Sequence, residues 1–266
     1  GFEDYDIYEI DFFINQLDPI QVLAFSSEFI SSTSWKFTYN GQESVRQKRY
    51  DFFSSDIEIG GSIQSLIANS SGILNENNGV TNLWNVPVYQ FARLELDYRY
   101  YIRPSREQLY VFRLNSGYIL PYGISTITSP EGTIRLPPFS RFFFLGGTND
   151  MRAWPAYRAG GGIATTTNYE EDGVSSFAIG TLKFLSNIEY RFPLYSSLKG
   201  AVFLDAGNIW LTGGLETEES GFRLGNFARD LYLGSGFGLR LDLDFFVIRF
   251  DTGLRLRDPG YWAQNE

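Results

Sequence analysis

The sequence predicts an all-β protein, a transmembrane antiparallel β-barrel with a long loop folded into its interior. Three observations predict it. Apolar and polar residues alternate along segments of about 10–14 residues, aromatic residues make up 17% of the chain, and short and long connections alternate between the segments. Segments of this length suit a tilted membrane crossing better than the strands of about 5–6 residues usual in soluble sheets. Alternation places one apolar face against lipid and one polar face toward the lumen.

The alternating pattern predicts about nine strands, of which the first two are weakly marked. In chain order they are residues 5–15, 28–42, 53–67, 88–102, 108–120, 182–194, 198–210, 231–243 and 246–256. Aromatic residues near strand ends, such as Tyr98, Tyr118 and Trp210, are expected to form girdles at the membrane interfaces. The alternative is a soluble β-sandwich whose polar face meets water, and strand length and loop alternation both argue against it.

The connections fall into two classes. Tight turns are predicted at residues 103–106, 193–196 and 242–244, and long polar links at residues 68–87, 120–176 and 212–229. Short turns on one rim and long loops on the other are typical of outer-membrane barrels.

Composition excludes several classes of function. The 266 residues include no His and no Cys, which removes thiol catalysis, imidazole acid–base chemistry and Cys/His zinc sites. A net charge of −9 argues against a nucleic-acid partner. Two acidic pairs, 170–171 and 218–219, lie in predicted loops and are expected to be solvated rather than catalytic. We therefore expect no enzymatic activity, no catalytic residue, no cofactor and no bound metal ion.

The longest link, residues 120–176, is far longer than a hairpin needs, and such loops are usually functional or disordered. Its centre is apolar at residues 141–145 and then turns through Gly146 and Gly147 toward Arg152 and Trp154. An apolar hairpin of this kind is costly in water, so we expect it to fold into the lumen.

Inside a barrel, the Arg152 guanidinium needs acidic partners, because an unpaired buried charge is strongly disfavoured. Glu189 and Asp205 lie on the polar faces of the next two predicted strands. A guanidinium can bridge two carboxylates, so we expect Arg152 to pin the loop to both strands. The alternative is that Arg152 is a solvated loop charge and that the two acids only hydrate the lumen.

Residues 146–154, taken with residues 203–210, resemble the C-terminal barrel of the BamA/TamA outer-membrane assembly superfamily, of the bacterial surface antigen type. The family's loop motif is Gly-Gly, a short spacer, a hydrophobic residue, Arg, Gly and an aromatic, and its strand motif is Phe-x-Asp-x-Gly. Residues 188–193 resemble the strand after the loop, which carries the matching glutamate. Ala153 stands where most members have Gly. The resulting Arg-Ala-Trp version is most similar to the TamA-like lipoprotein branch of Bacteroidetes-type bacteria.

The resemblance implies a 16-stranded barrel, of which residues 1–266 would be the second half, a partial outer-membrane β-barrel. The N-terminal periplasmic repeats and the final strand would lie outside this sequence. Residues 120–176 would be a latch loop inserted in the lumen. The implied latch residues are Gly146, Gly147, Arg152, Trp154, Glu189, Asp205 and Gly207.

The resemblance also implies a function in the cell outer membrane. The protein would insert, assemble or translocate other outer-membrane proteins without bond-making chemistry, by templating substrate strands at the barrel seam. Its partners would be unfolded outer-membrane proteins, outer-membrane lipid or lipopolysaccharide, and a periplasm-spanning TamB-like protein. Two alternatives stay open: a passive outer-membrane channel or porin, and a barrel that anchors a fused patatin-like lipase.

Overall fold

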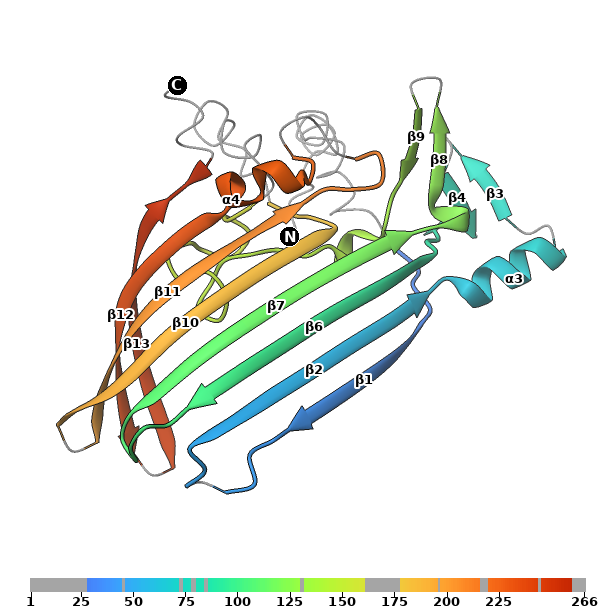
Figure 1. Cartoon of the computed structure of the whole chain (residues 1–266). Helices are drawn as coiled ribbons and strands as arrows, with labels where there is room; N and C mark the ends of the chain where they lie inside the picture. Colours follow the sequence, from blue (N-terminus) through green and yellow to red (C-terminus); the bar gives the residue numbers. More distant parts are fainter. Residues whose placement is uncertain are drawn as a thin grey trace, which may run out of the picture.

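An eight-stranded antiparallel sheet organises the computed structural model of the chain (Figure 1). The structure describes residues 28–259 except 45, 72–73, 78–79, 84–85, 130–131, 161–177, 196, 216–219 and 244. The sheet order is β1 (Ser32–Asn40), β2 (Arg49–Gly60), β6 (Phe91–Ile102), β7 (Leu109–Pro121), β10 (Leu182–Tyr195), β11 (Leu198–Trp210), β12 (Tyr232–Leu243) and β13 (Phe246–Arg257). The predicted all-β antiparallel architecture is confirmed. The predicted strand at 5–15 and the two acidic pairs lie outside the described residues.

One predicted strand is wrong in its second half. The segment 53–67 leaves the sheet at Gly60, and residues Ser62–Ser71 form the helix α3. Gly61 causes the break, because its φ of 78° lies in the left-handed region that ends an extended strand. The apolar residues after Gly61 fit a helical repeat as well as an alternating one, so periodicity did not distinguish them.

The connections divide the sheet into a short-turn end and a long-connection end, as predicted. The turns β1–β2, β6–β7, β10–β11 and β12–β13 lie together at the lower end of Figure 1. The long connections hold the small elements: α3, β3 (Leu74–Asn77), β4 (Val80–Leu83), β5 (Val86–Pro87), η2 (Gly123–Ser125), β8 (Thr126–Ser129), β9 (Gly132–Arg135), η3 (Phe139–Arg141), η4 (Leu224–Asn226) and α4 (Phe227–Asp230). Across the described ranges, no helix is both long and apolar enough to cross a membrane.

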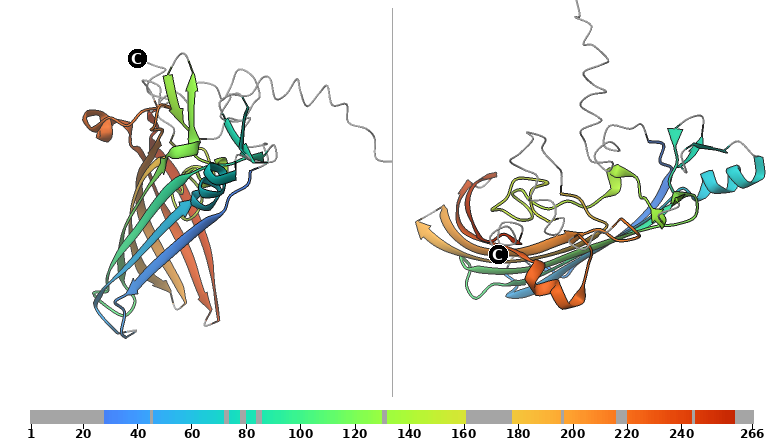
Figure 2. Two further views of the ribbon diagram at one scale, coloured as in Figure 1. Left: turned by 90° about the vertical axis from the view of Figure 1, so that its right-hand side faces the viewer. Right: turned by 90° about the horizontal axis from the view of Figure 1, so that it is seen from above.

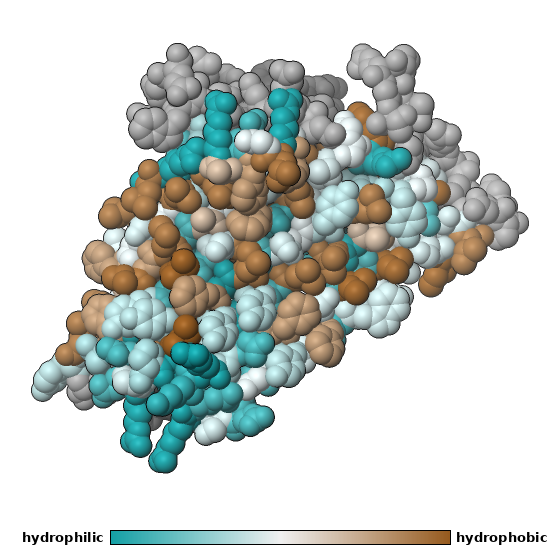
Figure 3. Space-filling model, viewed as in Figure 1, coloured by the Kyte–Doolittle hydropathy of each residue, from teal (hydrophilic) through white to brown (hydrophobic). Residues whose placement is uncertain are grey.

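The sheet is curved, and its two faces differ in chemistry. Figure 2 shows it as an open arc, and Figure 3 shows that apolar and aromatic groups cover much of the convex face. Exposed side chains on that face include Leu94, Tyr98, Phe112, Leu114, Ile188, Val202, Leu204, Phe237 and Phe250. The intervening residues of the same strands carry the charged groups of the concave face, which confirms the predicted alternation.

The apolar core lies between the concave face and the long connection after β7. Leu145, Met151 and Trp154 of that connection are buried together with Ile209 of β11 and Tyr232 of β12. The β8–β9 hairpin of the same connection projects beyond the upper ends of the strands instead (Figure 1). This hairpin belongs to the connection predicted as the latch loop, and in the described sheets its strands β8 and β9 pair only with each other.

Candidate functional site

Arg152 sits at the centre of the loop, with its guanidinium between two strands of the concave face. Its Nη2 donates to Asp205 Oδ1 at 2.6 Å, its Nε to Asp205 Oδ2 at 2.9 Å, and its Nη1 to Glu189 Oε2 at 2.5 Å. The Arg152 backbone N–H also donates to Asp205, at 3.1 Å. The three side chains are 5%, 9% and 0% exposed for Arg152, Glu189 and Asp205. The arginine is therefore not a solvated loop charge.

Strand register explains how one guanidinium reaches both acids. Asp205 of β11 lies opposite Asn187 of β10, whereas Glu189 lies opposite Phe203. The acids are thus diagonal neighbours on one face, and the Phe203 ring between them lies 3.5 Å from the Arg152 guanidinium carbon, as a cation–π contact requires. Asn187 donates to Asp205 at 2.8 Å and occupies a further acceptor site of this carboxylate.

Burial alone would lower the pKa of Arg152, since it disfavours the charged form. The hydrogen bonds and charges of Asp205 and Glu189 outweigh burial and raise the pKa of Arg152 above its ordinary range. The guanidinium therefore stays charged, and its attachment to both strands persists at neutral pH. Removing one partner of such a buried ion pair costs about 3–5 kcal/mol, because the other charge is left uncompensated.

The ion pairs continue from Glu189 toward the last described strand. Glu189 Oε1 accepts from Arg191 at 2.6 Å and from Arg240 of β12 at 2.8 Å. Arg240 also pairs with Asp251 of β13 at 3.3 Å, and Asp251 pairs with Arg249. Arg152 therefore stands at one end of a charge network that spans β10 to β13. The sequence reasoning missed these cations, although each lies in phase with the predicted polar faces.

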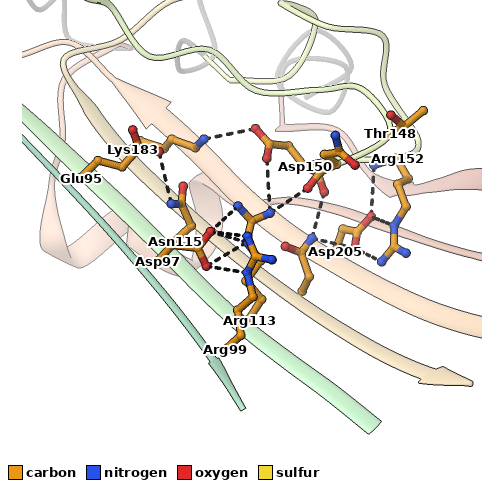
Figure 4. A network of polar contacts seen from close by, with 12 residues as sticks. Glu95, Asp97, Arg99, Arg113, Asn115, Thr148, Asp150, Arg152, Lys183 and Asp205 are labelled. Carbon is orange, nitrogen blue, oxygen red and sulfur yellow. Dashed lines mark hydrogen bonds and ion pairs between the residues drawn. The ribbon is translucent and has the colours of Figure 1, made fainter. Parts of the chain in front are cut away.

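Asp150 anchors the loop a second time, on the other side of Arg152 (Figure 4). Its carboxylate accepts from Lys183 of β10 at 3.1 Å and lies 3.5 Å from a guanidinium nitrogen of Arg113 on β7. Arg113 in turn pairs with Asp97 of β6 at 2.8 Å. The Asp150 carbonyl accepts from Asn187 at 2.9 Å. Asp150 was not among the predicted site residues, since an acid beside an arginine in a loop has no distinctive spacing.

Two glycines shape the turn that presents these side chains. Gly146 has a φ of 109° and Gly147 a φ of 90°, a region that disfavours other residues. The Gly147 N–H donates to the carbonyl of Trp154 at 2.7 Å and closes the turn. Gly207, the last glycine of the predicted set, lies on β11, where an ideal Cβ would be 2.8 Å from the Phe184 carbonyl oxygen and 3.4 Å from a Leu145 methyl group.

Ala153, the residue after Arg152, packs on two glycines of the sheet. An ideal Cβ at Gly234 of β12 would lie 3.0 Å from the Ala153 Cβ, and one at Gly253 of β13 would lie 2.7 Å from the Ala153 Cα. Trp154 is buried beside them, with its Nε1 donating to Asp258 at 3.3 Å. Glycine on both facing strands makes room for Ala153 at a position where the resembling family most often has glycine.

Chemically, this arrangement holds a loop in place. All seven residues predicted for the latch lie at or beneath one turn, and Arg152 joins two of them by ion pairs. Within the described ranges, no group of three or more metal-ligating side chains is placed to hold a metal ion. The charges of the site satisfy one another, and the geometry supports bracing of the sheet by the loop.

Comparison with known proteins gives a family match. Residues 66–266 match the family model described as the Omp85 superfamily domain, and no curated protein matches the chain. BamA from Haemophilus ducreyi, solved without POTRA domains 1–3, is 10% identical over 86% of this chain and 51% of its own, with a TM-score of 0.48. CdiB from Acinetobacter baumannii is 10% identical over 87% of this chain and 39% of its own, with a TM-score of 0.38. The chain spans about half of the BamA structure and less of CdiB.

Proposed function

Because this chain belongs to the Omp85 superfamily, we propose that it forms part of an outer-membrane β-barrel that inserts or translocates other outer-membrane proteins. The observation that carries the proposal is the buried Arg152 held by Glu189 and Asp205 in a sheet with an apolar convex face. A purely structural loop would need no buried charge, since apolar packing of similar volume is as stabilising or more so. We assign the buried charge of Arg152 to positioning of the loop during function.

The proposed mechanism is non-enzymatic and uses strand pairing. Substrate strands would add to an exposed barrel edge, where backbone hydrogen bonds supply the binding energy. The charge network from Arg152 to Asp251 supports a bracing role, because it ties the loop to β13, the strand nearest the seam that the resemblance implies. The loop would hold this part of the wall in shape while the edge opens.

Unfolded outer-membrane proteins are the proposed substrates, and the outer membrane with its lipid and lipopolysaccharide is the proposed location. The Arg-Ala-Trp sequence at residues 152–154 supports placement in the TamA-like lipoprotein branch, with a TamB-like periplasmic protein as partner. The space that Gly234 and Gly253 leave for Ala153, because neither has a Cβ, is consistent with this variant of the motif.

The test of this proposal combines depletion with substitution in the full-length protein. Depletion should lower the amount of folded outer-membrane proteins in the cell, measured by their heat-modifiable migration on gels. Arg152→Ala should reproduce part of that loss, whereas Arg135→Ala, an exposed charge outside the network, should not. Normal folding of outer-membrane proteins after depletion, with large steady conductance in planar bilayers, would instead identify a passive channel.

A charge swap tests the contact itself. Arg152→Glu and Asp205→Arg should each impair function and heat resistance, because each leaves like charges buried together. The double variant should recover part of both. A double variant no better than either single one would contradict direct pairing as the source of the effect.

A further inference from the structure

The first two short turns of the sheet form one continuous surface at its lower end. Residues 41–48 connect β1 to β2, and residues 103–108 connect β6 to β7. Because β2 pairs with β6 from Arg49↔Ile102 onward, the two turns are neighbours. The Arg103 backbone N–H donates to the Lys48 carbonyl at 2.7 Å and joins them directly. We call the described residues of the two turns, all but residue 45, together with Arg49, the basic rim.

The basic rim reverses the charge balance of the chain. It holds five cations, Arg46, Lys48, Arg49, Arg103 and Arg106, and two acids, Glu43 and Glu107, in a protein whose acids exceed its cations by nine. Asp51, the next acid along β2, brings the acids to three. Four of the five cations are exposed, all except Arg103, which is half-buried. The hydrophilic cluster at the lower end of Figure 3 lies over these turns.

These exposed cations are also free of internal partners. Within the described part of the chain, the side chains of Arg46, Lys48, Arg49 and Arg106 make no ion pair. By contrast, the cations of the charge network on the concave face form ion pairs with acids of the same network. An excess of unmatched positive charge on one rim indicates a negatively charged external partner.

The position of the rim indicates what that partner is. Arg49 shares the convex face of β2 with Ile57 and Ile59, by the alternation of the strand, so its side chain leaves the wall on the lipid side. Tyr110 and Tyr190 stack on the same face with ring centroids 4.4 Å apart, and the Tyr190 hydroxyl accepts from Gln108 at the edge of the rim. Tyrosines at this height are typical of a membrane–water interface.

We propose that the basic rim binds the anionic phospholipid headgroups of the leaflet that it faces. The exposed guanidinium and ammonium groups carry the charge opposite to that of phosphate and can donate hydrogen bonds to it. The stacked pair Tyr110 and Tyr190 places these groups at the depth of the headgroups. A soluble protein partner fits less well, because Arg49 leaves the wall on its lipid-facing side. This inference rests on the sheet being a membrane wall, and it does not rest on the insertion of substrate proteins.

The experiment uses the full-length protein in nanodiscs of mixed phosphatidylglycerol and phosphatidylcholine. The lipid retained after gentle extraction is identified by native mass spectrometry. The test variant carries Lys48→Gln, Arg49→Gln and Arg106→Gln. The matched control carries Arg135→Gln, Arg223→Gln and Arg229→Gln, three exposed cations that lie in the long connections.

The wild-type protein and the control should retain phosphatidylglycerol preferentially, and the preference should weaken at high salt. The rim variant should lose at least tenfold in preference, since each cation near an anionic surface contributes about fivefold. Heat-modifiable migration of the variant checks that it is folded. An unchanged preference in the folded rim variant, an equal loss in the control, or no preference in the wild type would overturn the proposal. Loss of a co-purifying protein with lipid preference intact would overturn it in favour of a protein partner.

Discussion

Gly253→Ala should displace the loop without changing any charge. Gly253 lies on β13 directly beneath the turn, and an added Cβ would be 2.7 Å from the Ala153 Cα, 2.8 Å from the Arg152 carbonyl oxygen and 2.9 Å from the Ala153 nitrogen. All three are backbone atoms, so no side chain can rotate away. Non-bonded carbons rest at about 3.5–4.0 Å, and the loop must therefore move by about 1 Å. The φ of Gly253 is not in the left-handed region, so the backbone conformation at this position suits alanine and the penalty comes from the clash with the loop.

The expected effect is large enough to measure. Overpacking of this kind costs about 1–3 kcal/mol, which would raise the population of the undocked loop by about 5- to 150-fold. Trypsin can report this population, because it cleaves after arginine and the Arg152 side chain is only 5% exposed while docked. Cleavage then follows the open fraction as long as the loop closes faster than it is cut. The rate of cleavage after Arg152 in the full-length protein is the measurement.

Gly225→Ala is the matched control, because an ideal Cβ at Gly225 has no atom within 4 Å. Its cleavage rate after Arg152 should equal that of the wild-type protein. The reasoning is refuted if folded Gly253→Ala protein is cut at the wild-type rate. It is equally refuted if Gly225→Ala accelerates cleavage as much as Gly253→Ala does.

Three further substitutions test the site and the neighbouring helix α4. Asp150→Asn keeps the size of the side chain but removes its charge from Lys183, so the loop should undock more easily, by about 2 kcal/mol, seen as faster proteolysis. Trp154→Phe keeps an aromatic ring and removes the donor to Asp258, which should lower the urea midpoint by an amount equivalent to about 1 kcal/mol. Burial raises the pKa of Asp230 above its ordinary value of 3.8, so its contribution to stability is present below that value and is lost as pH rises through the folded pKa. Asp230→Asn should therefore flatten the stability profile over that range, measured by denaturation at several pH values.

The sequence predicted the strands after the loop better than the region before it. The segment 198–210 coincides with β11, and the segment 182–194 differs from β10 by one residue. Both strands alternate cleanly because one face meets the charged interior and the other is apolar. The segment 53–67 failed at Gly61, where a single left-handed glycine turns the chain into α3. Such a break depends on one φ value and leaves the apolar spacing nearly unchanged.

The candidate site divides in the same way. The pairing of Arg152 with Glu189 and Asp205 could be anticipated, since strand phase puts both acids on the polar face and a buried cation needs partners. Asp150 and Arg240 could not be, because their partners are set by which strands become neighbours across the curved wall.

The sequence by itself determined the two faces of the wall, since a side-chain period of two is a local property of each strand. It also indicated that Arg152, once buried, would pair with acidic side chains. Only the tertiary structure decided that Asp205 lies opposite Asn187 and diagonal to Glu189. It alone decided that two glycines of neighbouring strands leave room for Ala153. It also decided that the ion pairs extend to β13. The register of the β10–β11 hairpin depends on the geometry of its turn, and the ion pairs that reach β13 depend on the curvature of the wall. The alternation within a single strand specifies neither.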